Sequence, residues 1–293
     1  MHFSSATLVL AAALSTAAAH PSVRANHAHL HRAAARSPKF VKYEQPAETT
    51  TAAAPAQPSA ESGSFYEEKD DDSYDDSASD SSPSPPAGKK EFCSGSKKRA
   101  TAADISYEGN TGEGEWGCNI MEIDCGSIDQ YDYTAEFSST GGEYSCSAFN
   151  KIGPTGDIDG FWHSALDFGV SGSKVCLAFD TDTQGGVACG EGSAGPPKTD
   201  IGQFAGTWLE MDAGSGKNGG NSGSDVSTLV ADANGGKGTI SMSIEAPGKG
   251  TCSKLSLKEP HTSHDYYKGG MEAEDGVGCK GYKKGTIFIT LGD

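Results

Sequence analysis

From residue 92 to the C-terminus, apolar and polar positions alternate in short runs that are rich in β-branched and aromatic residues. Such runs are typical of β-strands, in which successive side chains point to opposite faces. The runs that predict strands are NIMEID (119–124), DYTAEFSS (132–139), YSCSAFNKI (144–152), SKVCLAFD (173–180), GTWLEMD (206–212), DVSTLV (225–230), GTISMSI (238–244) and GTIFITL (285–291). Glycine pairs predict turns between them at residues 141–142, 185–186, 219–220, 235–236 and 269–270. This pattern predicts an all-β domain over residues 92–293, a β-sandwich or a jelly-roll-like fold.

Helical patterns are rare in this part of the chain. Only ATAADI (100–105) and the segment around Tyr266 have a mildly helical pattern. We therefore expect strands and turns to form nearly the whole domain.

The chain before residue 92 has a different composition. Residues 1–19 contain an apolar run and end in three alanines, which predicts a secretory signal peptide cleaved before His20. The alternative is a buried amphipathic helix. Residues 20–91 are poor in aromatic residues and pass from a basic part to a Thr/Pro/Ser-rich part and then an acidic part. Such a segment buries too little apolar surface to fold, so we expect a disordered leader on a secreted protein that is extracellular or associated with the cell wall.

Two basic clusters, Lys89-Lys90 and Lys97-Lys98-Arg99, resemble processing sites of secretory-pathway proteases. Cleavage after Lys90 keeps every cysteine with the domain, whereas cleavage after Arg99 separates Cys93 unless a disulfide holds it. The even cysteine count favours the first site. The alternative is a solvated basic patch that balances the acidic run before it.

Eight cysteines in an exported chain predict disulfides, because the extracellular compartment is oxidising. They are Cys93, Cys118, Cys125, Cys146, Cys176, Cys189, Cys252 and Cys279. About 105 pairings are open if all eight are bridged, and the spacing selects none of them. A structural zinc site is disfavoured, since the chain has no C-x2-C pair.

The formal net charge of −17 narrows the possible partners. It argues against nucleic acid, whose phosphates need clustered Lys and Arg, and against anionic membrane surfaces. Charge of this sign and size is expected to keep an exported protein soluble and monomeric.

Two strand segments carry paired carboxylates. Glu122 and Asp124 lie in MEIDCGS, and Glu210 and Asp212 lie in LEMDAGS. Alternation places each pair on one strand face, with its side chains about 7 Å apart. The laminarinase-like jelly-roll glycosidases carry E-x-D-x-x-E, but a serine replaces the third acid in both segments, and a proton donor is then missing. A solvated strand face is the favoured interpretation, and catalysis by either pair is the alternative.

Trp116, Trp162 and Trp208 are candidates for stacking against sugar rings, because an exposed indole offers a flat apolar surface with one polar group. The alternative is burial in the core, which the neighbouring Leu209 favours for Trp208.

Metal and nucleophile patterns are incomplete. The candidate metal ligands His261, His264 and Asp265 follow a proline in an expected loop, where a surface cluster is the favoured interpretation. The D-x-D pairs at 157/159 and 180/182 lack the bidentate glutamate of a calcium-binding EF-hand loop and are typical of turns. No G-x-S-x-G nucleophile motif occurs. We therefore expect no metal site and no cofactor.

Several segments together resemble one known family. They are FCSGSKKRATAADISYEGNTGEGEWGCNIMEI, QYDYTAEF, NKIGPTGDIDGFW, LAFDTDTQGGVAC, GQFAGTWLEMDAGSGKNGGNSGSDVS and GGMEAEDGVGCKGY. In this order they are similar to the secreted fungal allergen family typified by Aspergillus fumigatus allergen four. The resemblance implies an exported β-rich protein recognised by host IgE, with no catalytic residue to transfer. Asn221 stands where the family often has an aromatic residue, which weakens the idea of an aromatic ligand platform in this loop.

These observations leave three functions open. The favoured one is a non-enzymatic allergen-type protein that binds carbohydrate or protein at the cell wall or on a host. The alternatives are a carbohydrate-active enzyme that uses strand carboxylates and a secreted effector directed at a host.

Overall fold

The structure, a computed structural model, describes residues 89–93, 109–112 and 114–293. The predicted signal peptide (1–19), the predicted leader up to residue 88, the ATAADI helix (100–105) and the second basic cluster (97–99) lie outside these residues.

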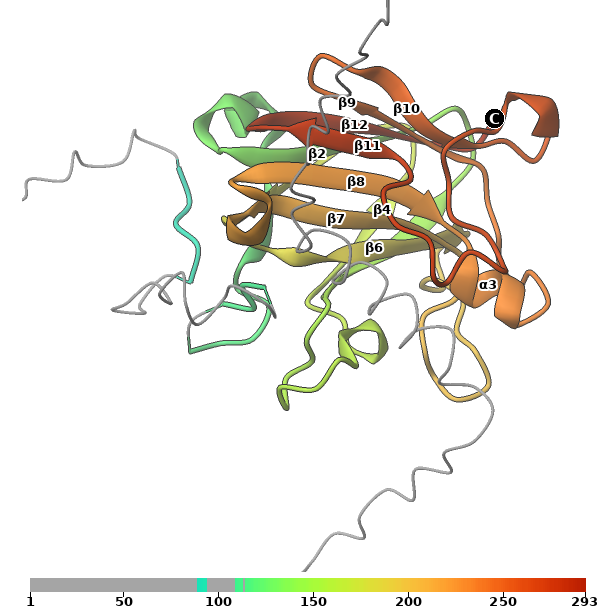
Figure 1. The fold of residues 1–293 in the computed structure, drawn as a ribbon, viewed down its shortest axis with the longest axis horizontal. Coiled ribbons are helices and arrows are strands. Elements are labelled where there is room, and N and C mark those ends of the chain that lie inside the picture. Colours follow the sequence, from blue (N-terminus) through green and yellow to red (C-terminus); the bar gives the residue numbers. More distant parts are fainter. Residues whose placement is uncertain (1–88, 94–108, 113) are drawn as a thin grey trace, which may run out of the picture.

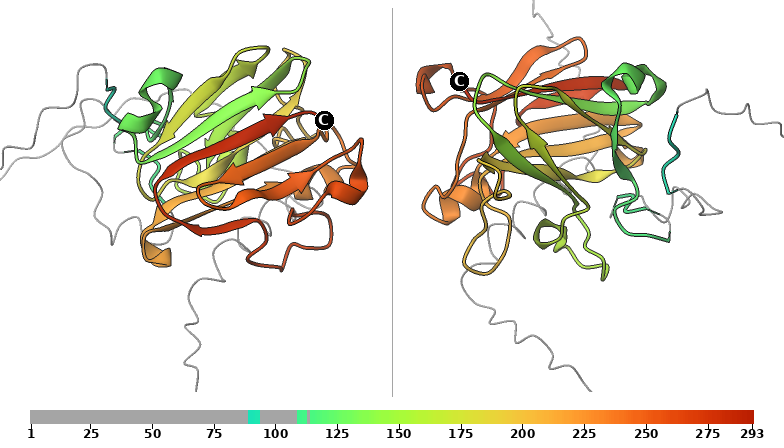
Figure 2. Two further views of the ribbon diagram at one scale, coloured as in Figure 1. Left: turned by 90° about the horizontal axis from the view of Figure 1, so that it is seen from above. Right: turned by 180° about the vertical axis from the view of Figure 1, so that it is seen from behind.

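In the described part of the chain, twelve strands form two six-stranded sheets packed as a β-sandwich (Figure 1, Figure 2). The first sheet has the order β1 (Ile120–Ile123), β5 (Val175–Phe179), β2 (Tyr133–Ser139), β12 (Gly285–Leu291), β9 (Met242–Ala246) and β10 (Gly250–Leu255). The second has the order β11 (Cys279–Tyr282), β8 (Asn221–Ser227), β7 (Thr207–Ser215), β6 (Gln184–Glu191), β3 (Tyr144–Asn150) and β4 (Leu166–Val170). The all-β prediction is confirmed.

The last strand lies in the middle of the first sheet. β12 pairs in parallel with β2 from Gly285↔Tyr133 to Leu291↔Ser139, and it pairs antiparallel with β9 on its other side. The remaining strand pairs in both sheets are antiparallel. The two ends of the folded domain are therefore joined within one sheet.

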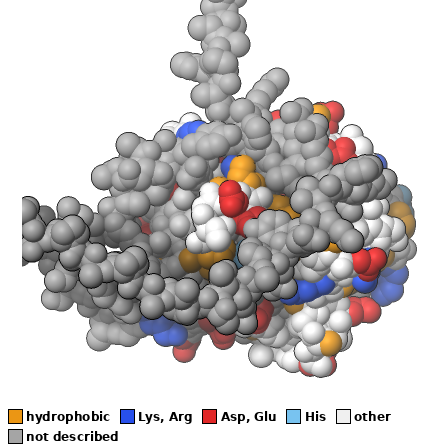
Figure 3. Space-filling model, turned by 90° about the horizontal axis from the view of Figure 1, so that it is seen from below, with side chains coloured by type: hydrophobic (Ala, Val, Ile, Leu, Met, Phe, Trp, Pro, Cys, Tyr) orange, Lys and Arg blue, Asp and Glu red, His pale blue; other side chains and the backbone are white. Residues whose placement is uncertain are grey.

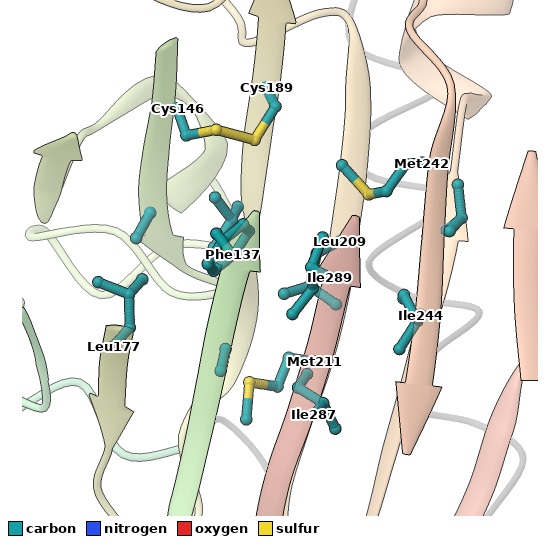
Figure 4. Packing of buried hydrophobic residues seen from close by; sticks show 14 of the residues in the cluster. Phe137, Cys146, Leu177, Cys189, Leu209, Met211, Met242, Ile244, Ile287 and Ile289 are labelled. Atoms are coloured by element: carbon teal, nitrogen blue, oxygen red, sulfur yellow. A yellow bond between two sulfur atoms is a disulfide. The ribbon is translucent and has the colours of Figure 1, made fainter. Parts of the chain in front are cut away.

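The main core lies between the sheets. Phe137, Leu177 and Ile289 of the first sheet pack in one cluster with Leu209 and Met211 of the second (Figure 4). Each fully buried apolar side chain of this size contributes roughly 1.5–3 kcal/mol relative to an exposed position. This cluster is the main apolar contribution to holding the two sheets together.

The helical elements are short. Among the described residues they are η1 (Cys125–Gln130), η2 (Gly160–Trp162), η3 (Gly216–Asn218), α3 (Leu229–Ala233) and η4 (Pro260–Thr262). No helix among the described residues has the length and apolar character needed to cross a membrane. The mildly helical interpretation of the Tyr266 segment is wrong, because Tyr267 forms an isolated β-bridge with Ser227 there.

Two other expectations from the sequence need correction. The predicted strand 225–230 ends at Ser227, and helix α3 begins two residues later. Residues 185–186 do not form a turn but lie inside β6. A Cβ on Gly185 would lie 2.0 Å from the Phe149 carbonyl oxygen, and one on Gly186 would lie 2.6 Å from the Leu209 carbonyl oxygen. These glycines allow backbones to approach closely.

All eight cysteines are bridged. The pairs are Cys93–Cys118, Cys125–Cys176, Cys146–Cys189 and Cys252–Cys279. The last pair joins β10 of the first sheet to β11 of the second. The first pair would hold residue 93 to the domain after a cut at Arg99, so the even cysteine count does not distinguish the two basic clusters.

Candidate functional site

Strand β7 is buried along its whole length, which overturns one expectation from the sequence. Leu209 and Met211 face the core between the sheets, so the alternating residues Trp208, Glu210 and Asp212 lie on the outer face of the second sheet. Glu210 is 1% exposed and Asp212 is 7% exposed. The interpretation of this pair as a solvated strand face is wrong.

A third carboxylate comes from the neighbouring strand. Asp225 of β8 lies directly opposite Glu210 of β7 and is 2% exposed. Side chains at such opposed positions have Cβ atoms about 4.5–5.5 Å apart. In the E-x-D-x-x-E motif of the jelly-roll glycosidases, the third acid would stand at the position of Ser215, on the same strand. The structure supplies an acid from the adjacent strand instead.

Two of the three carboxylates line a pocket of about 230 Å³, which we call the acid pocket. Its walls come from β7, β8, β11 and the loop before β11. The lining includes Asp212, Asn218, Asn221, Gly223, Ser224, Asp225, Tyr267, Asp275, Val277, Cys279 and Lys280. Glu210 belongs to the same strand face but is not among the lining residues.

Burial changes the acidity of these carboxyl groups. It raises the pKa of Asp212 to about 7, and the charge of Asp182 acts in the same direction. Hydrogen bonds from Ser215 and Asn218 oppose the rise, as does the charge of Lys151. Burial also raises the pKa of Asp225 well above its usual range, with further contributions from Glu210 and Asp275. The pocket therefore presents protonated carboxyl groups at mildly acidic pH.

The two carboxyl oxygens of Asp212 differ in their hydrogen bonds. Oδ2 of Asp212 accepts a hydrogen bond from Nδ2 of Asn218 at 2.9 Å. Oδ1 of the same group is buried and has no hydrogen-bond partner among the described residues. Buried polar atoms in proteins usually have a hydrogen-bond partner, so Oδ1 is the pocket atom that a ligand hydroxyl group would satisfy.

Local contacts hold the walls of the acid pocket in place. The turn that the sequence predicted at residues 219–220 joins β7 to β8, and its Gly219 adopts the left-handed conformation (φ 61°) next to Asn218. On the other side, the Tyr267 hydroxyl accepts a hydrogen bond from the Val277 backbone N–H at 3.3 Å. The Thr228 N–H donates to the Tyr267 carbonyl oxygen at 2.9 Å, which ties this residue to the end of β8.

The other carboxylate pair lies apart from the acid pocket. Glu122 is exposed on β1, as expected of a solvated strand face, whereas Asp124 is exposed just beyond the end of the strand at Ile123. The Asp124 side chain caps η1 by accepting a hydrogen bond from the Gly126 N–H at 2.7 Å. The Glu122 carbonyl oxygen accepts one from Nζ of Lys90 at 3.1 Å. This pair has a structural role at the edge of the first sheet.

The tryptophans differ in exposure. Trp208 is 2% exposed and packs edge-on against Phe149, with ring centroids 4.9 Å apart. Trp208 is therefore a core residue, as its neighbour Leu209 favoured, and it is not a candidate for stacking against a sugar. Trp116 and Trp162 are half-buried, and each donates a hydrogen bond from its indole N–H to a backbone carbonyl oxygen. Both keep a partly exposed ring.

The remaining polar candidates support loops. Asp180 accepts a hydrogen bond from Nδ2 of Asn110 at 3.0 Å, and Asp182 accepts one from the Gly216 N–H. Asp159 lies 3.8 Å from Nε2 of His163. In the part of the chain that the structure describes, no group of three or more His, Cys, Asp or Glu side chains could hold a metal ion.

Apart from Asn221, the pocket residues outside β7 were not candidates from the sequence. Asp225 had a weak signal, since it begins the predicted strand 225–230 and alternates with Ser227. Asp275 and Lys280 had none, because an isolated charge near glycines is typical of any surface loop. Their contribution depends on the packing of the loop before β11.

The surface outside the pocket carries charges of both signs. Figure 3 shows Asp and Glu side chains beside Lys and Arg side chains over the described part of one face. Ion pairs of this kind include Lys174 with Glu136, at 2.6 Å, and Lys284 with Asp132, at 2.8 Å. The second pair is exposed at both ends, and such a pair contributes little to stability.

Comparison with known proteins shows which family this domain is similar to. Residues 118–291 match the family described as Allergen Asp f 4-like domain. The chain is also 30% identical over 202 residues to Allergen Asp f 4 of Aspergillus fumigatus. The similar stretch covers 65% of this chain and 60% of that relative, so the chain spans about three fifths of the relative's length. The family match includes all the strands that build the acid pocket.

Proposed function

Because the chain belongs to the Allergen Asp f 4-like family, we propose that it is an exported allergen-type protein that binds a neutral glycan in the acid pocket. Its four disulfides and the signal-peptide pattern of residues 1–19 support export to an oxidising compartment. Recognition by host IgE belongs to the same proposal and rests on the family. The observation that carries the binding function is the buried Asp212 carboxyl group with one oxygen unused inside a pocket.

The chemistry of the pocket suits a sugar. Carboxyl and amide groups from Asp212, Asn218 and Asn221 can donate hydrogen bonds to sugar hydroxyl groups and accept hydrogen bonds from them. The carboxyl groups and the overall charge of −17 disfavour anionic sugars. A volume of about 230 Å³ is small compared with the roughly 300–1,000 Å³ of sites for drug-sized ligands. We therefore expect one sugar residue to enter the pocket.

A pocket-filling variant tests this function. Gly223 lines the pocket, and a Cβ built on it would lie 3.7 Å from the Cys279 carbonyl oxygen, an ordinary contact. Gly223→Leu should therefore fold and fill the pocket, while Gly223→Ala is the matched control. We expect insoluble β-glucan, chitin or mannan to retain the wild-type protein and Gly223→Ala, and retention of Gly223→Leu to fall about tenfold or more. A wild-type protein that binds none of the three would refute the proposal.

A second candidate function is hydrolysis of the bound glycan. The observation that favours it is the Asp212 carboxyl group, whose raised pKa suits a proton donor to a glycosidic oxygen. Asp225, which lines the same pocket, would then have to supply the second carboxyl group that glycosidases need, in its ionised form.

Release of reducing ends from the polysaccharide that is bound would measure this activity. We expect Asp212→Asn to lower the rate about 100-fold or more and Glu122→Gln to leave it unchanged. Equal rates in the wild-type protein and Asp212→Asn would exclude Asp212 as the proton donor.

A further inference from the structure

A second hollow lies on the outer face of the same sheet, over β3 and β4. Its volume is about 680 Å³, within the range of ligand-binding sites. Its floor comes from these two strands, and one wall comes from residues 193–198. We call it the serine groove because Ser145, Ser147, Ser164 and Ser193 line it.

Strand alternation explains the polar floor of the serine groove. Tyr144, Cys146 and Ala148 face the core between the sheets, so Ser145 and Ser147 point to the outer face. In the pairing of β3 with β4, Ser145 lies opposite Gly169, and Ser147 lies opposite Asp167. Gly169 therefore contributes no side chain to the floor beside Ser145.

The polar groups of the floor are arranged around one carboxylate. Oδ1 of Asp167 accepts hydrogen bonds from the Ser147 hydroxyl and from the Ser164 hydroxyl, the latter at 2.6 Å. The Ser145 hydroxyl differs from these two. Ser145 is only 7% exposed, and its buried hydroxyl has no hydrogen-bond partner among the described residues. A buried hydroxyl without a partner in the floor of a groove indicates a position for a ligand hydroxyl group.

The charge of the groove restricts its ligand. Among the described residues that line the groove, Glu143 and Asp167 are balanced only by Lys198, whose Nζ lies 4.9 Å from the centroid of the Phe204 ring. This composition disfavours phosphate and nucleic acid, which need clustered cations. The serine hydroxyl groups and the carboxylate of the groove can form hydrogen bonds with the hydroxyl groups of a neutral sugar. We propose that the serine groove is a second glycan-binding site, which shares the ligand class of the proposed function but uses different residues.

The strand order separates the two sites. β6 and β7 lie between β3 and β8, and neighbouring strands are about 4.8 Å apart, so β3 and β8 are about 14 Å apart. One sugar residue cannot reach both sites. A polysaccharide chain that crosses the strands can contact both, which would strengthen retention on an insoluble polymer.

A matched pair of glycine variants tests the serine groove. Gly169 has no left-handed φ, and a Cβ built on it would lie 3.8 Å from the Tyr144 carbonyl oxygen. Gly169→Leu should therefore fold and fill the groove, with Gly169→Ala as its control and Gly223→Leu as the variant of the other site. We expect Gly169→Leu to lower retention on the polysaccharide that binds the wild-type protein about tenfold, and Gly169→Ala to stay within about twofold.

The outcomes separate the two proposals. Loss in Gly169→Leu with retention in Gly223→Leu supports the serine groove and refutes the acid pocket as the binding site. The reverse result refutes the serine groove and leaves the proposed function intact. If Gly169→Leu does not give the wild-type near-UV circular dichroism spectrum, Ser145→Ala replaces it as the test. If Ser145→Ala folds and the polysaccharide retains it as strongly as the wild-type protein, the inference is overturned.

Discussion

Two strands of this protein carry nearly the same pattern and have opposite environments. IMEID (120–124) contributes β1, and WLEMD (208–212) lies in β7. Both place a glutamate and an aspartate two residues apart between apolar residues. In the first segment both acids are exposed, and in the second both are buried.

Position in the sheet explains the difference. β1 is the edge strand of the first sheet, whereas β7 lies between β6 and β8 inside the second. The outer face of β7 is also covered at one end, where Phe149, Phe161 and Phe204 pack around Trp208. The local pattern determines which side chains share a strand face. Neighbouring strands and loops determine whether that face is exposed to solvent.

The largest difference that we predict concerns the apolar residues at matching positions. Leu209 is fully buried between the sheets, while Met121 is half-buried at the edge. Leu209→Ala should lower the free energy of unfolding by about 2–5 kcal/mol because it leaves a cavity. Met121→Ala should cost clearly less. Urea unfolding measures both values, and equal losses would contradict the contrast between the strands.

The next prediction concerns pH and the acid pocket. The pKa of Asp212 is raised in the folded state from the ordinary 3.8 to about 7, so the folded protein binds more protons than the unfolded chain between these values. The free energy of unfolding should therefore fall as pH rises from about 4 to about 7, by up to about 4 kcal/mol from this group. Burial of Asp225 acts in the same direction.

Asp212→Asn removes the contribution of Asp212 to this pH dependence. Relative to the wild type, the variant should gain stability as pH rises through this range. Urea unfolding of both proteins at several pH values gives the difference. Parallel stability curves would show that the Asp212 carboxyl group ionises normally in the folded protein.

The smallest predicted effects belong to the exposed pair. Asp124→Ala removes the cap of η1 and should cost about 0.5–2 kcal/mol. Glu122→Gln should change stability by less than about 0.5 kcal/mol, since the side chain is exposed and only its backbone oxygen is used. A larger loss in Glu122→Gln than in Asp124→Ala, measured by thermal unfolding, would reverse this assignment.

The sequence predicted the fold class because strand alternation and glycine turns are local signals. The run 285–291 matches β12 residue for residue, but nothing local indicates its parallel pairing with β2, which starts 152 positions earlier. β6 was missed because Gly185 and Gly186 resemble a turn, although close backbone approach requires them. Disulfide pairing also depends on distant contacts.

The acid pocket was partly visible from the sequence. Glu210 and Asp212 were identified as candidates with the correct shared face, but their burial was not predicted. Burial depends on the neighbouring strand and on the loop that ends at β11, both outside the local pattern. Asp225 completes the group only because the register of β7 and β8 places it opposite Glu210.

Asp212 of the acid pocket is a buried carboxyl group whose raised pKa keeps it protonated up to near-neutral pH. Carbon-13 NMR titration of the side-chain carboxyl groups tests it most directly, with the Asp212 signal assigned by its absence in Asp212→Asn. We predict a titration midpoint of about 7 for this signal. A midpoint near the ordinary value of 3.8 would show a solvated carboxylate and contradict the claim.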